Sequence, residues 1–378
     1  MEEKKKFDFK ALLTADINDL FKKKTASSSK PSKIKKPKLM LKPIVSFDFG
    51  NEFIKVVEGR YINNQLKITN YFMIPTQGFI EDGRILDVAR LSEVVKKSLE
   101  ENNVKAKHAV CTLNSTQIIN RELFVPVVED EELDTVVRYE IQQFLPINLA
   151  DYLIQYVVLE EVEISGQPRL KLNVVTFPEK MASSYYELFK EVGLKPYALD
   201  VSYNALGKLA NYTQLVKEVT DLEGTVAFVD IGAQSIDLNI FKNGNIQFTR
   251  LIKSGGIIIH ERLNQLPDMS IKSAASLIES ANLTDEDPAS RVLRLCVDEM
   301  MYELERVLQF YRNKSVGNQI DHLFILGGLS HLEGLPTYMS DKLNIPVSLL
   351  DELNQVSFEK PANEIYHYIN AIGAMIRL

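Results

Sequence analysis

The chain has 378 residues, of which 45% are hydrophobic and 25% charged, and its net charge is −7. This balance is typical of a soluble globular protein with two domains or one large two-lobed domain. A transmembrane helix is excluded because no run of eighteen apolar residues is present, and the N-terminus lacks the apolar core of a secretory signal.

The first 43 residues form a basic extension with 13 lysines and 5 acidic residues. Its net charge of +8 leaves −15 for the rest of the chain. The low-complexity segment TASSSKPSKIKKPKLMLKP predicts a largely disordered linker. Leu13, Ile17, Leu20 and Phe21 recur at helical spacing, so this part could dock on a membrane surface or a partner. We predict no nucleic-acid partner.

From Lys42 onward, strand and helix patterns alternate, which predicts an α/β fold. The predicted strands cover 44–49, 53–59, 65–73, two strands within 107–125, 152–162, 168–177, 195–200, 225–230, 235–241, 246–252 and 321–326. The predicted helices cover 88–102, 130–145, 178–192, 203–216, 270–281, 286–313 and 362–376. Cys111 and Cys296 lie far apart in apolar segments, and this favours a reduced, cytoplasmic setting.

One motif occurs twice. FDFGNEFIKVVE (47–58) and VDIGAQSIDLNI (229–240) both consist of a strand, Asp-x-Gly, three residues and Ile, followed by a second strand. Asp48 therefore corresponds to Asp230, and Gly50 to Gly232. A single Asp-x-Gly is a common turn. Two copies in matching three-strand contexts predict two similar lobes.

The repeated residues suit the binding of phosphate. Consecutive N–H groups in a tight hairpin form an anion-binding concavity, and glycine lets the backbone approach a phosphate. An aspartate at each strand end can hold Mg²⁺ through its water shell. Two such hairpins facing across a cleft predict a clamp for the phosphates of a nucleotide.

A third motif, HLFILGGLSHLEGLPTYM (322–339), reads as a strand, Gly-Gly and a helix, a corner that can pass close to a purine and its ribose. Asp-Phe-Gly also occurs in protein kinases, but here no Gly-x-Gly-x-x-Gly loop precedes it and no His-Arg-Asp follows. A P-loop and the Cys-x-x-Cys and His-Glu-x-x-His metal motifs are also missing from the sequence.

Together, the three motifs resemble the phosphate-1, phosphate-2 and adenosine motifs of the actin-like ATPase superfamily, which includes actin, sugar kinases and Hsp70. Within it, the chain from Ile44 onward is similar to the PilM family of type IV pilus assembly proteins, relatives of FtsA. The similarity extends to RYEIQQFLPINLADYLIQYVVL (138–159), FTRLIKSGG (248–256) and ELERVLQFYR (303–312).

This resemblance implies a two-lobed actin-like fold of duplicated RNase H-like domains. It places lobe I at 44–116 and 178–215, an inserted 1C-type subdomain at 117–177, and lobe II at 216–378, with the C-terminal helix returning to lobe I. It also implies that the N-terminal peptide of PilN, an inner-membrane protein, docks on the inserted subdomain. Glu140, Gln143 and Pro146 are the candidate contacts.

The resemblance also implies ATP and Mg²⁺ as ligands. Asp48 and Asp230 would organise the metal. The candidate nucleotide contacts are Gly50, Asn51, Glu52, Phe53, Lys55, Gly232, Ala233, Gln234, Ser235, Gly255, Gly256, Glu303, Arg306, Gly327, Gly328 and Leu329. Glu303 and Arg306 could instead form a surface pair at i and i+3. Gln234 is the candidate for orienting the water that attacks the phosphate. Any ATPase activity is expected to be slow at most.

Glu52 departs from the small hydroxyl residues common in the family. A carboxylate beside a triphosphate is repulsive by about 1 kcal/mol, even when it is exposed and screened. Glu52 could point away, join the Mg²⁺ water shell or weaken nucleotide binding. We expect it to point away, because a hairpin can place its side chain on the far face.

The predicted function is a cytoplasmic, peripheral ATP-binding protein of pilus assembly, whose nucleotide state modulates the binding of a PilN-like partner. Contact with other pilus proteins and self-association are compatible with this prediction. The alternatives are an FtsA-like filament protein at the membrane and a phosphotransferase of the same superfamily.

Overall fold

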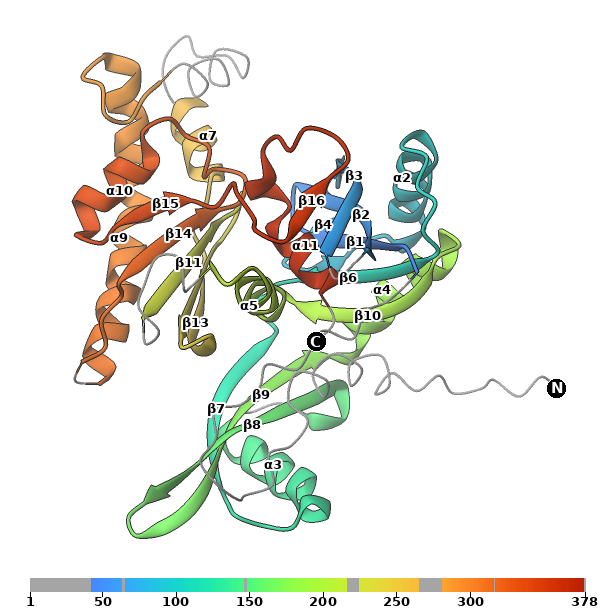
Figure 1. The fold of residues 1–378 in the computed structure, drawn as a ribbon, viewed down its shortest axis with the longest axis vertical. Helices are drawn as coiled ribbons and strands as arrows, with labels where there is room; N and C mark the ends of the chain where they lie inside the picture. Colours follow the sequence, from blue (N-terminus) through green and yellow to red (C-terminus); the bar gives the residue numbers. More distant parts are fainter. Residues whose placement is uncertain are drawn as a thin grey trace, which may run out of the picture.

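Two large β-sheets form the centre of the molecule, and a third, smaller sheet extends away from them (Figure 1). The computed structural model describes residues 42–62, 65–145, 148–215, 224–264, 281–315 and 317–376. The basic extension before residue 42, Pro146 and most of the predicted helix 270–281 lie outside the described residues. No helix in the described ranges is long and apolar enough to cross a membrane.

The first large sheet has six strands in the order β10-β6-β1-β2-β3-β16. Their bounds are β1 (Ile44–Phe49), β2 (Phe53–Ile62), β3 (Gln65–Pro75), β6 (His108–Leu113), β10 (Lys195–Val201) and β16 (Val356–Phe358). Strands β1, β2 and β3 are antiparallel neighbours, whereas β6 and β10 continue the sheet in parallel beyond β1. With α2 (Val88–Glu101) and α4 (Glu179–Glu191), this sheet forms lobe I.

The second sheet repeats this topology with five strands in the order β13-β12-β11-β14-β15. Their bounds are β11 (Thr225–Ile231), β12 (Ile236–Lys242), β13 (Asn245–Ile252), β14 (His322–Leu326) and β15 (Val347–Leu349). Again three antiparallel strands are followed by two parallel ones. With α7 (Ile257–Asn264), α9 (Pro288–Lys314) and α10 (Leu335–Leu343), it forms lobe II, and the repetition confirms the two similar lobes predicted from the duplicated motif.

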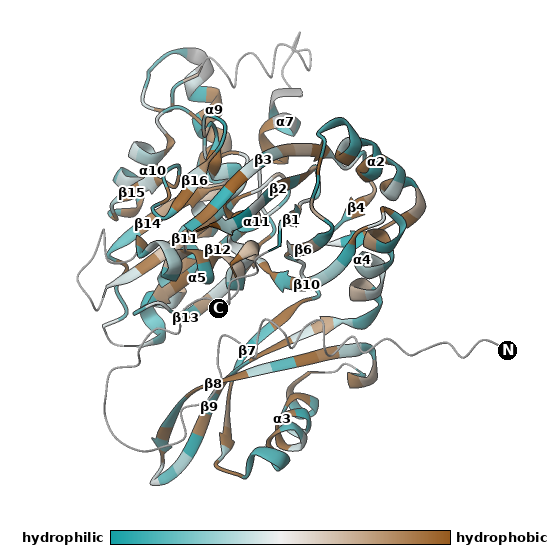
Figure 2. Ribbon diagram, turned by 45° about the vertical axis from the view of Figure 1, so that its right-hand side comes forward, coloured by the Kyte–Doolittle hydropathy of each residue, from teal (hydrophilic) through white to brown (hydrophobic). Residues whose placement is uncertain are grey.

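Helices separate the two sheets and cover their outer faces. α5 (Ser202–Thr213) and α11 (Ile369–Met375) share one continuous apolar core with the inner faces of both sheets. α2 and α4 cover the outer face of lobe I, while α7, α9 and α10 cover that of lobe II. Figure 2 shows hydrophobic residues concentrated in the sandwiched strands. The inner layer is therefore in contact with both lobes.

A buried ion pair anchors α5 to the lobe I sheet. Asp200, near the end of β10, accepts a hydrogen bond of 2.6 Å from the Nζ of Lys208, whose side chain is 1% exposed. Asn204 donates to the other oxygen of the same carboxylate. A buried charge is costly unless it is paired in this way. The pair therefore holds α5 in a fixed position relative to the end of β10.

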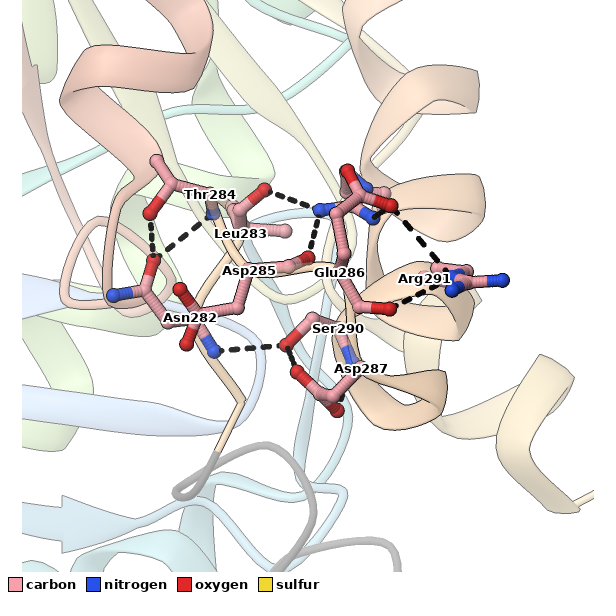
Figure 3. Close-up of polar contacts among 9 residues, drawn as sticks. Asn282, Leu283, Thr284, Asp285, Glu286, Asp287, Ser290 and Arg291 are labelled. Carbon is pink, nitrogen blue, oxygen red and sulfur yellow. Dashed lines mark hydrogen bonds and ion pairs between the residues drawn. The ribbon is translucent and has the colours of Figure 1, made fainter.

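A capping network sets the start of α9, which covers lobe II (Figure 3). The carboxylate of Asp287 accepts from the backbone N–H and the hydroxyl of Ser290, in the manner of a helix N-cap. The Ser290 hydroxyl also accepts from the N–H of Asn282, and Glu286 pairs with Arg291. The N–H of Leu283 donates to the carbonyl of Glu333, which precedes α10. This hydrogen bond links the segment before α9 to the segment before α10.

The inserted unit has its own sheet, helix and core. β7 (Ile119–Pro126), β8 (Tyr152–Ile164) and β9 (Gln167–Pro178) pair in the order β7-β9-β8. α3 (Asp130–Phe144) and the 3₁₀ turn Leu149–Asp151 complete the unit. Leu133, Val137 and Ile141 of α3 are buried against the sheet, whereas Phe144 at the end of the helix is 55% exposed.

The C-terminal helix is shorter than the predicted 362–376. The segment consists of a 3₁₀ turn at Ile365–His367 and then α11, because Glu364 adopts a left-handed conformation with a φ of 53° that interrupts a helix. The sequence analysis also missed the short strands β4 (Ile80–Glu81), β5 (Arg84–Ile85), β15 and β16. Two or three residues carry too little alternation to be detected.

The crossing of α11 over α5 offers a test of the inner layer. A Cβ added at Gly373 would lie 2.3 Å from the carbonyl oxygen of Ala205, and this rigid backbone cannot yield. We expect Gly373→Ala to lower the free energy of unfolding by about 1–3 kcal/mol through overpacking, measured by denaturant titration. Gly328→Ala is the control, because no atom lies within 4 Å of its added Cβ. Equal stability of the two variants would contradict this crossing.

Candidate functional site

The two Asp-x-Gly hairpins have the same local geometry. The N–H of Gly50 donates to the carbonyl of Phe53 at 3.2 Å, and the N–H of Gly232 donates to the carbonyl of Ser235 at 2.9 Å. The first turn is further held by Thr76, whose N–H donates to the carbonyl of Glu52 at 2.9 Å. The Glu52 side chain is exposed. The N–H groups of Gly50 and Gly232 are therefore used inside their own turns.

Strand alternation directs both motif aspartates into the inner layer. On β1, Val45, Phe47 and Phe49 pack toward α2 and α4, so Ser46 and Asp48 face the other way, toward α11. On β11, Ala227, Val229 and Ile231 pack in the outer core of lobe II, so Asp230 also faces inward. The two acids therefore meet between the lobes.

The hairpin registers add two more charged groups at equivalent positions. Asp48 pairs with Lys55 across β1 and β2, and Asp230 pairs with Asp237 across β11 and β12. The Nζ of Lys55 lies 3.7 Å from the Oδ2 of Asp48. Lobe I thus contributes an acid and a base, while lobe II contributes two acids.

Three asparagine side chains of lobe I and α11 donate to this part of lobe II. Asn370 of α11 donates to the Oδ2 of Asp230 at 2.7 Å. Asn114, which follows β6, donates to the carboxylate of Asp237. At the hairpin tips, Asn51 donates to the Oε1 of Gln234 at 3.0 Å.

Burial makes all three aspartates weaker acids than usual. It raises the pKa of Asp48 to about 6, opposed by Lys55 and reinforced by Asp230. It raises the pKa of Asp237 to about 7, where the nearby charges of Asp230 and Asp48 add to the effect and the hydrogen bond from Asn114 opposes it. The pKa of Asp230 is also raised by burial, against the influence of Lys55 and Asn370.

The predicted glycine turns gather around the end of β11. The N–H of Gly256 donates to the carbonyl of Gly232 at 3.1 Å, and the N–H of Ile257 donates to that of Ala233 at 2.8 Å. A Cβ at Gly255 would lie 2.7 Å from both carbonyl oxygens, so only glycine allows this approach. The start of α7 is therefore held against the second Asp-x-Gly hairpin by hydrogen bonds.

The Gly327–Leu329 turn packs against the same strand end. Gly327 has a φ of +92°, and a Cβ there would lie 2.8 Å from the carbonyl oxygen of Ile231 and meet the carboxylate of Asp230. The N–H of Leu329 donates to the carbonyl of Ile231 at 3.1 Å. A Cβ at Gly328 would meet no atom within 4 Å, so this residue leaves open space beside the turn.

Two further predicted contacts, Glu303 and Arg306, lie on α9. Glu303 and Arg306 form an ion pair of 2.8 Å on α9, the surface pair that their i and i+3 spacing allows. Leu304, next to Glu303, lines a small apolar cavity together with Leu329. α9 therefore runs behind the Gly327–Leu329 turn, and the pair lies on its more exposed side.

The sequence analysis missed four residues that the fold adds to the site. Asn114 and Asn370 carry no motif, and His367 comes from the C-terminal segment. Burial, Lys55 and His331 lower the pKa of His367 to about 4, so its ring is neutral at pH 7. Asp237 had a detectable signal, because the overlay of the two motifs places it opposite Asp230 as Lys55 is opposite Asp48.

The sequence was compared with models of known protein families. A family model described as type IV pilus assembly protein PilM matches residues 46–377. The chain belongs to the PilM family.

Solved structures agree with the PilM fold. One, described as a PilM-PilN type IV pilus biogenesis complex, aligns with a TM-score of 0.75 and 20% identity over 88% of this chain and 97% of that chain. The ethanolamine utilization protein EutJ from Carboxydothermus hydrogenoformans aligns with a TM-score of 0.52 and 13% identity over 96% of each chain. At these identities the structures show the shared actin-like fold.

The acids of this PilM-family chain fit a hard cation. Asp48, Asp230 and Asp237 are buried together, and the ammonium group of Lys55 opposes the effect of burial on the pKa of Asp48 and of Asp230. No cluster of three or more His, Cys, Asp or Glu ligands was found in the residues that the structure describes. Mg²⁺ suits such a site, because it is commonly bound by one or two carboxylates and keeps several waters.

On the inserted unit, the predicted partner residues lie on the half-exposed side of α3. Glu140 is partly exposed, and Gln143 is exposed. Large apolar side chains nearby in the unit are also exposed, including Tyr139 at 62%. These residues lie in the inserted unit, whereas the three buried aspartates lie between the two large sheets, so the chain has two distinct candidate sites.

The raised pKa values predict how stability depends on pH. A carboxyl group with a raised folded-state pKa contributes stability that is fully present below pH 3.8 and lost as the pH rises past about 6 for Asp48 and about 7 for Asp237. Asp237→Asn should therefore make the metal-free protein lose less melting temperature between about pH 5 and about pH 8. Asp341→Asn, at an exposed position on α10, is the control. If the melting temperatures of the parent and of Asp237→Asn fall equally with pH, the raised pKa of Asp237 is refuted.

Proposed function

We propose that this protein is an ATP-binding adaptor of the type IV pilus assembly machinery. ATP and Mg²⁺ bind in the cleft between the lobes, and the inserted unit binds the N-terminal cytoplasmic peptide of a PilN-like inner-membrane protein. The nucleotide changes the affinity for this peptide. Such an adaptor works at the inner face of the cell membrane, held there by its partner.

The observation that carries the nucleotide proposal is the meeting of Asp48 and Asp230, from equivalent strands of two lobes, within one buried cluster. These acids would hold Mg²⁺ through water, and the metal would neutralise phosphate charge. The amides at the two hairpin tips would receive phosphate oxygens, since such concave turns bind anions. Lys55, beside Asp48 and the first turn, adds a positive charge on that side.

Support for the purine end comes from the glycines at the end of β11. The Gly327–Leu329 turn and the Gly255–Gly256 turn both contact this strand end or its hairpin, and a Cβ at Gly256 would lie 2.6 Å from the Cδ1 of Leu329. Space beside Gly328 would admit a flat base against backbone. Gln234 is engaged by Asn51, so an attacking water would need another orienting group while that bond lasts.

Support for the partner proposal comes from family membership and from the surface of the inserted unit. The unit combines exposed Phe124, Tyr139, Phe144 and Val158 with the acidic first turn of α3. Apolar groups of this kind serve as anchors for a peptide, and polar groups around them set its register. Strand β8 lies at the edge of its sheet among the described residues, which leaves one side open to an extended peptide.

Substitution of the cleft acids tests the nucleotide site. Asp48→Asn and Asp230→Asn should each weaken ATP–Mg²⁺ binding by at least about tenfold, because a neutral amide attracts the metal less than a carboxylate does. Isothermal titration calorimetry measures the affinity. Asp341→Asn is the control, because Asp341 is an exposed acid on the covering helix α10. Unchanged binding in both variants would remove these acids from the site.

A second titration tests the partner site. A labelled peptide from the cytoplasmic N-terminus of a PilN-like protein should bind Glu140→Ala/Gln143→Ala at least about fivefold more weakly than the parent, by fluorescence anisotropy. Glu305→Ala/Gln309→Ala is a matched control, since this Glu and Gln are bonded to each other on the surface of α9. Repeating the titration with ATP–Mg²⁺ measures the nucleotide effect. Equal weakening by both double variants would place the peptide elsewhere.

A further inference from the structure

The three asparagine contacts between the lobes follow one pattern. In each, an amide group from lobe I or α11 is the donor, and the acceptor belongs to the first hairpin of lobe II. The acceptors are Asp230 on β11, Gln234 at the turn and Asp237 on β12. The three hydrogen bonds therefore reach both strands of this hairpin and the turn that joins them.

The chemistry of the partners sets the direction of two bonds. A carboxylate only accepts hydrogen bonds when ionised, so the NH₂ group of Asn370 must face Asp230. The Oδ1 of Asn114 accepts from the N–H of Ser115 at 2.9 Å, which directs its NH₂ group toward Asp237. Both amide groups are thus oriented by their surroundings to meet lobe II.

The elements that carry these asparagines are fixed to lobe I. The Ser46 hydroxyl of β1 donates to the carbonyl of Ala371 at 2.6 Å, directly next to Asn370. Asn114 follows β6, which is paired in parallel with β1. Asn51 lies in the β1–β2 turn. Movement of lobe II away from lobe I would break all three contacts.

An amide suits this position better than a second cation would. The cluster holds three buried acids and Lys55. Each amide satisfies a buried acceptor without adding charge, so the cluster keeps its excess of acids and its attraction for a metal. Without these donors, Asp230 and Asp237 would lie buried beside Asp48 with their carboxyl oxygens lacking these hydrogen bonds.

We infer that Asn51, Asn114 and Asn370 form a cross-lobe clasp that holds the two lobes together, and that Asn114 and Asn370 position the acids of lobe II. ATP–Mg²⁺ then enters a site whose two halves are already aligned. Only this last step rests on the function proposed above, because the clasp consists of contacts within the chain.

The distance between the lobes in the ligand-free protein tests the clasp. Spin labels on cysteines introduced at Lys97 of α2 and Glu305 of α9 report this distance by pulsed EPR, in the full chain with EDTA and no nucleotide. Both label sites are exposed, whereas Cys111 and Cys296 are buried. The parent should give one narrow distribution.

Asn370→Asp and Asn114→Asp keep the size of the side chain but replace a donor by a carboxylate that faces another. Both should shift the distribution to longer distances, and Mg²⁺ alone should reverse part of the shift. Asn318→Asp, whose parent amide donates to the carbonyl of Tyr311 inside lobe II, should leave the distribution unchanged. Distributions equal to that of the parent for both clasp variants would overturn the inference.

The hairpin tips provide a test that does not disturb the buried cluster. Asn51→Ala and Gln234→Ala each remove one partner of a surface hydrogen bond, so folding is preserved. Each should broaden the distribution, and the double variant should broaden it no further. Additive effects would show that the two side chains do not act as a pair, and would remove this bond from the clasp.

Calorimetry on the same variants separates the two proposals. If the parent binds no ATP–Mg²⁺ but the clasp variants open, the clasp stands and the proposed ligand is wrong. If the parent binds ATP–Mg²⁺ and the clasp variants stay closed, the clasp is wrong and the nucleotide site stands.

Discussion

The burial of three carboxylates between the lobes is the constraint on which the rest of the site depends. Strand alternation directs Asp48, Asp230 and Asp237 into the layer that α5 and α11 share with both sheets. Charges in such a layer are costly unless donors or cations face them. The turns, the C-terminal helix and Lys55 supply those donors, and the three acids outnumber the one nearby ammonium group of Lys55.

The two lobes share the order and direction of five strands but differ in charge, and β16 adds a sixth strand to lobe I. Equivalent strand positions hold Lys55 in lobe I and Asp237 in lobe II, each opposite its motif aspartate. The two lobes therefore have different roles at the cleft. Lobe I and α11 supply Asp48, the ammonium group of Lys55 and the amide donors, whereas lobe II supplies Asp230 and Asp237. A symmetric pair of acid–base hairpins would neutralise itself and attract a cation less strongly.

The cleft and the inserted unit are connected through a short stretch of chain. Asn114 follows β6, donates to Asp237 in the cleft and lies five residues before β7 of the inserted unit. In the same stretch, the N–H of Thr116 donates to the carboxylate of Asp82 at 2.8 Å. A change at Asp237 thus has a direct physical route to β7. In the function proposed above, this route would couple nucleotide binding to partner binding.

The sequence by itself determined the α/β class, the two lobes and the positions of both hairpins, because repeated local signals such as Asp-x-Gly between strands depend on turn chemistry and strand alternation. It could also have indicated Asp237 through the overlay of the two motifs. Only the tertiary structure decided which side chains from distant segments join them. Asn114 and Asn370 belong to no local pattern, and they reach the acids because β6 pairs with β1 and because α11 packs between the sheets. The same holds for the short strand β16, which exists only because β3 offers an edge for it to pair with.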